Sequence, residues 1–359
     1  MPFHLSPKGR GTTNSPPNRF AKEVIVQDDG AWEEIARVDP DFEPTHLRTE
    51  TLTDDSRSII TINSSPDIGF SHSLNPYRGC EHGCSYCYAR PYHEYLGMNA
   101  GIDFETRIMV KSEAPTLLEK TLSKPSWKPV SLACSGVTDC YQPIEKELEI
   151  TRACLRILTD FRNPVGIITK NALVTRDIDL LAELARSEAS LVVISVTTLD
   201  SHLAGKLEPR ASRPAARLKA IKDLSDAGIP VGVSVAPIIP GLNDHEIPAI
   251  MEAAADCGAS FASGTILRLP YSVKDIFSSW LDQHFPNRKD LILSRIREIR
   301  GGAVNDSRFG SRMTGTGPLA KQIQQFIAVS KRRSGLESPR KFLNDKAFIR
   351  RLPGQLELF

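Results

Sequence analysis

The chain has 359 residues, of which 40% are hydrophobic and 25% are charged, which is the balance of a globular protein with one large core or two smaller ones. With 45 Lys and Arg against 43 Asp and Glu, the chain as a whole is not a polycation, so any affinity for nucleic acid must come from local patches. The lack of a long apolar run and of a secretory signal excludes a transmembrane protein and predicts a cytoplasmic one with no membrane contact.

Residues 1–45 are predicted to form a flexible basic arm. Residues 9–19 are polar and interrupted by Gly and Pro, and residues 1–22 contain four Lys or Arg and no acidic residue. This composition fits either a solvated tail or an arm that contacts backbone phosphates.

Short apolar, β-branched runs then recur about every 30 residues, which is the length of a βα unit. They cover residues 129–137, 165–169, 191–197, 231–238 and 261–267. Nearly continuous apolar strands indicate a parallel sheet that is buried on both faces. With one further strand before Cys80, the sequence predicts an α/β fold over residues 46–270, an open, partial (β/α)6 TIM-like barrel. Its chemistry is expected at the carboxyl ends of the strands.

The remainder of the chain is predicted to be an extension of the barrel. Residues 271–333 have helical periodicity and are expected to form a helical C-terminal extension. Residues 334–359 are expected to be an extended basic tail, since residues 331–351 carry eight Lys or Arg against two acidic residues.

The strongest chemical signal is the stretch Cys80-Glu81-His82-Gly83-Cys84-Ser85-Tyr86-Cys87. Three thiols so close together can bind one metal centre, and soft thiolates suit an iron–sulfur cluster or zinc. Three thiolates on a four-iron cubane would leave one iron with an open position. The alternatives are a zinc site with His82, His93 or Cys134 as fourth ligand, or buried structural cysteines.

The spacing Cys-x3-Cys-x2-Cys, with the aromatic Tyr86 before the last cysteine, resembles the radical SAM superfamily. The resemblance implies a 4Fe–4S cluster held by Cys80, Cys84 and Cys87. It also implies that S-adenosylmethionine (SAM) binds the open iron and is cleaved by one electron to a 5′-deoxyadenosyl radical. A donor such as flavodoxin or ferredoxin would supply that electron.

Polar residues at the other strand ends are candidates for binding SAM together with Tyr86. Ser135 and Asp139 follow the second strand, where many members of the superfamily have a Gly-Gly-Glu-type element that this chain lacks. A hydroxyl at Ser195 suits the ribose, and Lys170 or Arg210 could offset the SAM carboxylate. Each of these residues also fits an ordinary capping or surface role. The turn after the fifth strand, with Ile239 and Gly241, resembles the superfamily's adenine-contacting turn.

Within the superfamily, the chain resembles spore photoproduct lyase and its uncharacterised relatives. The similar stretches are Ala133-Cys134-Ser135, Thr169-Lys170, Leu207-Glu208-Pro209-Arg210 and Val235-Ala236-Pro237-Ile238-Ile239. The resemblance implies a lyase-like DNA repair enzyme with damaged or modified nucleic acid as substrate. It also implies Cys134 as the catalytic hydrogen-atom donor, although a buried packing role fits this cysteine too.

The last five residues resemble the pentapeptide with which bacterial replication and repair proteins bind the DNA sliding clamp. Leu358 and Phe359 would fill an apolar pocket, with Gln355 as polar contact and Leu356 beside them. The alternative is that the tail folds back onto the barrel. For the whole chain, the competing hypotheses are a radical SAM enzyme that modifies RNA, a polypeptide or a small molecule, and a non-catalytic zinc-binding adaptor.

Overall fold

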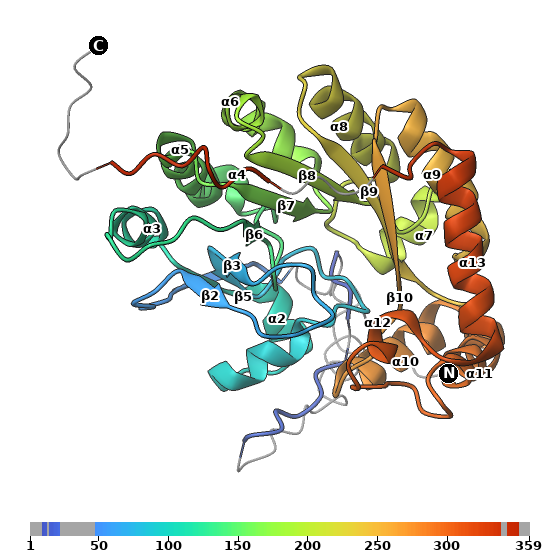
Figure 1. Cartoon of the computed structure of the whole chain (residues 1–359). Helices are drawn as coiled ribbons and strands as arrows, with labels where there is room; N and C mark the ends of the chain where they lie inside the picture. The colour runs from blue at the N-terminus through green and yellow to red at the C-terminus, as the bar shows by residue number, and fades with distance from the viewer. Residues whose placement is uncertain (1–8, 13, 22–46, 339–342, 352–359) are drawn as a thin grey trace, which may run out of the picture.

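The structure, a computed structural model, describes residues 9–12, 14–21, 47–338 and 343–351. Its centre is a seven-stranded sheet with the order β10-β9-β8-β7-β6-β3-β2 (Figure 1). The strands are β2 (Ile60–Ile62), β3 (His72–Leu74), β6 (Leu132–Cys134), β7 (Val165–Thr169), β8 (Ser190–Ser195), β9 (Val231–Ile238) and β10 (Phe261–Ile266). From β3 to β10 all neighbours are parallel, and β2 pairs antiparallel with β3 at the edge. The six parallel strands confirm the predicted open barrel.

The strands form where the sequence is apolar on both faces. All six residues of β8 are buried, and so are Val231 and Val233 of β9. Helices follow the strands and pack on the outer side of the sheet (Figure 1). They are α3 (Ala114–Leu122), α4 (Glu145–Leu148), α5 (Ile150–Phe161), α6 (Ile178–Arg186), α8 (Pro214–Asp226) and α9 (Ile247–Asp256). Helix α7 (Ser201–Leu207) instead packs with the turn after β9 and with residues 273–281. The short helices η2 (Ala172–Asp177) and η3 (Asp244–Glu246) precede α6 and α9.

A second, three-stranded sheet that the sequence did not predict flanks the barrel. It consists of β1 (Glu50–Thr53), β4 (Tyr77–Arg78) and β5 (Arg107–Val110) in the order β1-β5-β4. The helices η1 (Arg90–Leu96) and α2 (Ile102–Thr106) lie between β4 and β5 in the chain. The segment with the three clustered cysteines therefore leaves β4 and enters η1, next to this small sheet.

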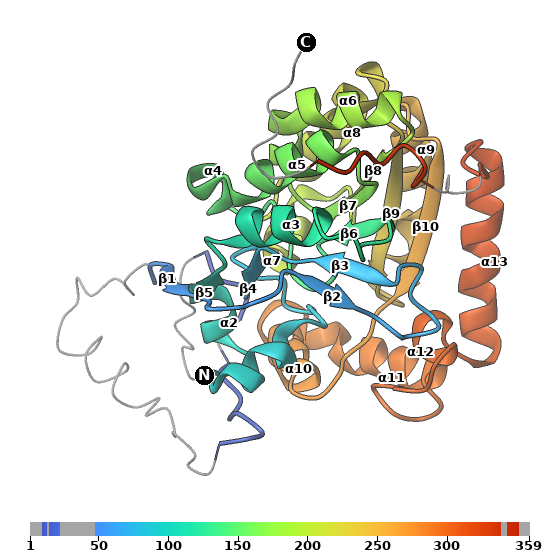
Figure 2. The same ribbon diagram turned by 60° about the vertical axis from the view of Figure 1, so that its left-hand side comes forward.

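The predicted extension is helical and packs on the barrel. Its helices are α10 (Val273–His284), η4 (Pro286–Arg288), α11 (Lys289–Ile299), α12 (Ser311–Thr314) and α13 (Gly317–Arg333). Figure 2 shows α13 running along the side of the sheet formed by β9 and β10. Among the described residues, no helix combines the length and apolarity needed to cross a bilayer.

The described part of the predicted tail is not a free extension. Glu337 bridges to Phe261 at the start of β10, and the backbone N–H of Asn344 donates to the Glu188 carbonyl at 3.0 Å. The Ile349 N–H donates to the Phe161 carbonyl at 2.9 Å, where Phe348 also packs. These backbone hydrogen bonds and buried contacts hold the segment on the barrel. The clamp-like motif of Gln355, Leu356, Leu358 and Phe359 lies outside the described residues and stays a prediction.

Candidate metal centre and cofactor site

The loop of residues 79–87, here called the cluster loop, carries the three clustered cysteines. Its backbone is anchored where the Cys80 N–H donates to the Phe104 carbonyl at 2.8 Å and the Ser85 N–H donates to the Leu207 carbonyl at 3.1 Å. Gly83 has a φ of +66°, and a Cβ there would meet the Glu105 carboxylate at 2.7 Å. The loop can therefore curl tightly only with glycine at this position.

The three thiols of the cluster loop fit an iron–sulfur cubane. All are free, and Cys80 and Cys84 are buried. Burial raises the pKa of Cys80, Cys84 and Cys87. Thiolates at this place therefore need the positive charge of a metal centre, which the irons of a cluster supply. These three cysteines are the residues that would hold the cluster.

The same region offers no single-ion site. Within the described ranges, no three His, Cys, Asp or Glu side chains lie close enough together to hold one metal ion. A cubane binds each thiolate at a different iron, so its ligands need not meet at one point. The histidines considered as zinc ligands have protein partners: His93 Nε2 lies 3.1 Å from the Arg107 carbonyl, and His82 Nδ1 lies 3.4 Å from Asp139.

A buried ion pair fixes the back of the cluster loop. Arg90 donates through Nη2 to Glu105 at 2.5 Å and through Nε to the Cys84 carbonyl at 2.9 Å. Both side chains of the ion pair are fully buried. Breaking such a pair would leave an uncompensated buried charge, so it holds the loop in one position. Neither residue could be recognised from the sequence, because neither belongs to the cysteine motif.

Residues 10–12, within the predicted arm, are buried, and Gly11 lies directly against the cluster loop. The Arg10 guanidinium donates to the carbonyls of Glu105 at 2.7 Å and Leu47 at 2.5 Å, and the Gly11 N–H donates to the Glu105 carboxylate at 2.8 Å. A Cβ on Gly11 would stand 1.5 Å from the Gly83 carbonyl oxygen. These buried hydrogen bonds fix the segment in place although its composition is polar.

Glu208 is the centre of a buried polar network opposite the cluster loop. Its carboxylate accepts hydrogen bonds from Tyr86, Thr197 and Arg217, and Lys170 Nζ lies 3.2 Å away. Burial alone would raise the pKa of Glu208, but the charges of Arg217 and Lys170 outweigh it and hold the pKa well below its usual range. The carboxylate is therefore charged, and it positions Tyr86 and Lys170.

Three predicted SAM residues, Tyr86, Lys170 and Ser195, belong to this one network. Lys170 Nζ donates to Ser195 Oγ at 2.7 Å, to Thr197 Oγ1 at 3.1 Å and to the Ala236 carbonyl at 2.9 Å. These contacts occupy all three N–H donors of the ammonium group. Holding the SAM carboxylate through Lys170 would require one of them to be exchanged.

Asp139 and Ser135 organise the loop after β6. Asp139 accepts hydrogen bonds from Thr169 Oγ1 and from the Lys170 N–H, both at 2.8 Å. Ser135 has a φ of 80°, and its Oγ accepts from the Cys140 N–H at 2.8 Å. The structure thus connects Asp139 to the end of β7. Arg210 lies apart from this group, with its guanidinium 3.0 Å from the Glu81 carboxylate of the cluster loop.

The turn with Ile239 and Gly241 follows β9. The buried Ile239 donates its N–H to Asn243 Oδ1 at 2.6 Å, and Asn243 Nδ2 donates to the Thr197 carbonyl at 2.7 Å. Gly241 has a φ of +81°, and its N–H donates to Asp244 at 3.0 Å. This network connects the turn to the strand end that carries Thr197, so both predicted residues lie at the expected edge of the sheet.

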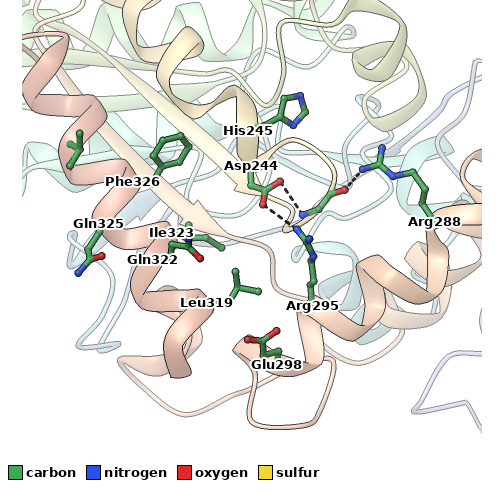
Figure 3. A pocket seen from close by; sticks show the side chains of 12 residues that line it. Asp244, His245, Arg288, Arg295, Glu298, Leu319, Gln322, Ile323, Gln325 and Phe326 are labelled. Carbon is green, nitrogen blue, oxygen red and sulfur yellow. Dashed lines mark hydrogen bonds and ion pairs between the residues drawn. The ribbon is translucent and has the colours of Figure 1, made fainter.

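A pocket of about 930 Å³ opens beside this turn, between α11 and α13 (Figure 3). Asp244 lies between the Gly241 backbone and Arg295, and Arg288 donates to the Gly241 carbonyl at 2.5 Å (Figure 3). Of the predicted cofactor residues, Gly241 alone lines the pocket. The pocket is therefore distinct from the region of the cluster loop.

Cys134 ends β6 and is 1% exposed. Cys140 is also buried, and burial, followed by the neighbouring Cys134, raises the pKa of Cys140 well above that of a free cysteine. Two buried, free cysteines thus belong to the same core cluster near the carboxyl end of a barrel strand.

Comparisons with known proteins agree with this geometry. The family model for the radical SAM superfamily matches residues 74–254. An uncharacterised protein of Mycobacterium tuberculosis is 34% identical over 234 residues, which is 65% of this chain and 68% of the relative. An uncharacterised protein of Methanocaldococcus jannaschii is 29% identical over 234 residues, or 65% and 84% of the two chains.

Among solved structures, a spore photoproduct lyase complexed with dinucleoside spore photoproduct aligns with a TM-score of 0.56 at 15% identity, covering 79% of each chain. At this identity the likeness supports the fold, and the superfamily match over half of the chain supports the chemistry. The chain belongs to the radical SAM superfamily and is therefore an enzyme that uses a 4Fe–4S cluster and SAM.

Proposed function

We propose that this enzyme acts on damaged or modified nucleic acid and that Cys134 returns a hydrogen atom to the substrate. The observation that carries the proposal is the buried thiol of Cys134 at the carboxyl end of β6, in the same buried cluster as Cys140. The fold shared with a lyase whose solved complex contains a dinucleoside photoproduct supports the substrate class.

The proposed chemistry uses the chain's residues as follows. When bound, the cluster and SAM supply a 5′-deoxyadenosyl radical that takes a hydrogen atom from the substrate. Cys134 then gives its Sγ–H hydrogen atom to the substrate carbon radical, so that an S–H bond breaks, a C–H bond forms and a thiyl radical remains. A hydrogen atom from 5′-deoxyadenosine restores the thiol if SAM is regenerated. An electron from a flavodoxin- or ferredoxin-type donor, with a proton, restores it if SAM is consumed.

The incorporation of deuterium from the solvent into the product tests this proposal. The enzyme is purified without oxygen, reconstituted with iron and sulfide, and incubated in D2O with SAM, dithionite and an ultraviolet-irradiated oligothymidylate. Because a thiol exchanges its proton, the wild-type product is expected to carry one deuterium atom. Cys134→Ala is expected to form a product without it and to retain its iron. Cys257→Ala, on a cysteine outside the site, is the matched control.

Two results would overturn the proposal. If irradiated and unirradiated oligonucleotides stimulate neither SAM cleavage nor product formation in the wild-type enzyme, nucleic acid is the wrong substrate class. If Cys134→Ala loses its iron, this cysteine is a ligand or a structural residue instead of a hydrogen-atom donor.

A further inference from the structure

A small surface beside the cluster loop combines exposed aromatic rings with an arginine that forms no ion pair within the described residues. We define it as the rim surface, formed by Tyr92, Arg268, Phe309 and Arg312. Arg268 lies two residues after the end of β10, and its guanidinium is 5.7 Å from the ring centre of Tyr88, which directly follows Cys87. The rim surface therefore borders the loop that carries the cluster ligands.

Arg268 is the residue that points to an anionic ligand. Its Nη1 donates to the Met313 sulfur at 3.4 Å, and its buried Nε has no hydrogen-bond partner. Within the part of the chain that the structure describes, no carboxylate forms an ion pair with it. Burial, and then the neighbouring Arg312, lower the pKa of Arg268. A bound anion would compensate the partly buried charge of the guanidinium.

The rings of the rim surface point to a ligand with flat faces. Tyr92 is 56% exposed and Phe309 is 62% exposed. The Arg312 guanidinium lies 4.7 Å from the centre of the Phe309 ring and forms an ion pair with Asp67. Tyr92 is close enough to both arginines to influence their pKa values. Exposed rings next to guanidinium groups are the arrangement on which bases stack while a phosphate is held alongside.

The row of rings continues beyond the rim surface. The rings of Tyr92 and Tyr95 have centres 6.5 Å apart, and those of Tyr95 and Phe20 are 4.9 Å apart. Arg19 lies 3.8 Å from the ring centre of Tyr271. An extended strand with several bases would find successive stacking partners along this row.

We propose that the rim surface binds a single-stranded or extruded segment of nucleic acid, with Arg268 on a phosphate and Phe309 and Tyr92 under the bases. This inference rests on the proposed function and specifies its substrate contact. A duplex would need many free cations for its phosphates. Here Arg312 is paired with Asp67, and Arg308 with Asp306. A surface that stacks bases on aromatic rings and holds one phosphate through Arg268 is suited to unpaired bases.

Binding of a fluorescein-labelled oligothymidylate of about ten nucleotides to the reconstituted enzyme, followed by anisotropy, tests the assignment. Arg268→Gln and Phe309→Ala are each expected to weaken binding by about fivefold or more. The matched controls are Arg332→Gln and Phe326→Ala, on exposed positions of α13, and they are expected to bind like the wild type. The logarithmic salt slope is expected to be about one, as for one or two phosphate contacts.

The possible results distinguish a failure of the rim-surface assignment from a failure of the proposed function. If the wild-type enzyme binds no oligonucleotide, the proposed function fails and this inference fails with it. If the wild type binds but Arg268→Gln and Phe309→Ala bind equally well, the rim surface alone is wrong. Equal, Arg268-dependent binding of an oligoglutamate would reassign the surface to acidic peptides. Iron content and thermal midpoint of each variant show whether a loss of binding reflects misfolding.

Discussion

At the scale of single residues, the most consequential charge is that of Glu208. This buried carboxylate neutralises the buried Arg217 and also contacts Lys170, so its removal leaves two cations without compensation. The uncharged isostere in Glu208→Gln keeps the shape but not the charge. We expect a loss of about 3–5 kcal/mol in the free energy of unfolding. Thermal unfolding followed by circular dichroism measures it. Glu183→Gln on α6 is the control, and an unchanged midpoint in Glu208→Gln would contradict the argument.

His93 gives the folded protein a dependence on pH. Burial lowers the pKa of His93 to about 4, and its Nε2 contacts the Arg107 carbonyl. Between this value and the unfolded pKa near 6.5, the unfolded chain binds more protons, so stability is full above pH ~6.5 and falls as the solution is acidified.

From pH 7.5 to 5.5 this histidine is expected to cost about 1 kcal/mol of stability. His93→Gln keeps a hydrogen-bond donor for the carbonyl but does not titrate. Thermal midpoints of both reconstituted proteins at the two pH values give the difference. The variant should lose less stability on acidification than the wild type, and equal losses would show that His93 does not titrate as inferred.

The residues that could be predicted from the sequence are those with local signals. Three cysteines in eight positions are recognisable without any fold, and the superfamily match supports the cluster that they imply. Glu208 lies in a stretch from which the sequence singles out only Arg210 as a candidate. Its importance depends on Arg217 and Tyr86, which the sequence separates and the barrel brings together. Charges that pair across the fold have no regular spacing in the sequence, so such a pairing could not be predicted from it.

At the scale of elements, the strands that could be predicted from the sequence are those with an uninterrupted run of apolar residues. The boundaries of β7 and β9 coincide with the predicted runs 165–169 and 231–238, because buried parallel strands are apolar on both faces. The small sheet was missed for the opposite reason. Strand β1 is Glu-Thr-Leu-Thr with mostly exposed side chains, and β4 has two residues. Such strands form by pairing with β5 and not by their own hydrophobicity.

The composition of residues 9–12 did not indicate that this segment packs against the cluster loop. A substitution of Gly11 tests whether that packing protects the cluster. Because Gly11 lies against the Gly83 carbonyl, a larger side chain must push this segment or the cluster loop aside. Gly11→Val is therefore expected to lower the iron bound per chain after reconstitution, to below about half of the wild-type value, and to speed cluster loss in air. Iron and sulfide content are measured.

The control for Gly11→Val is Gly9→Val. Gly9 has a φ of +79°, but a Cβ at this position would meet no atom within 4 Å, so this variant strains the backbone of the same segment without touching the cluster loop. Full iron content in Gly11→Val, or an equal loss in both variants, would show that contact with the loop is not what protects the cluster.

At the scale of the whole molecule, we expect the barrel and its C-terminal extension to unfold as one cooperative unit. Arg300, just after α11, donates to four backbone carbonyls: those of Ile266 and Leu267 at the end of β10, and those of Ser311 and Arg312 in α12. Burial and the nearby Arg268 lower the pKa of Arg300 to about 10, so the group stays charged at neutral pH. The hydrogen bonds of Arg300 thus connect β10, the last strand of the barrel, to α12, the helix that carries Arg312 of the rim surface.

Arg300→Met removes these donors and leaves buried carbonyls unsatisfied, which costs about 1–3 kcal/mol for each such group that water cannot reach. We expect one unfolding transition, several degrees below that of the wild type, because the extension and the barrel lose stability together. Arg297→Met, on an exposed position of α11, is the control and should unfold like the wild type. If scanning calorimetry resolved two transitions, with the lower one alone shifted, the extension would be a separate unit. The rim surface would then be only loosely connected to the barrel whose chemistry it is proposed to serve.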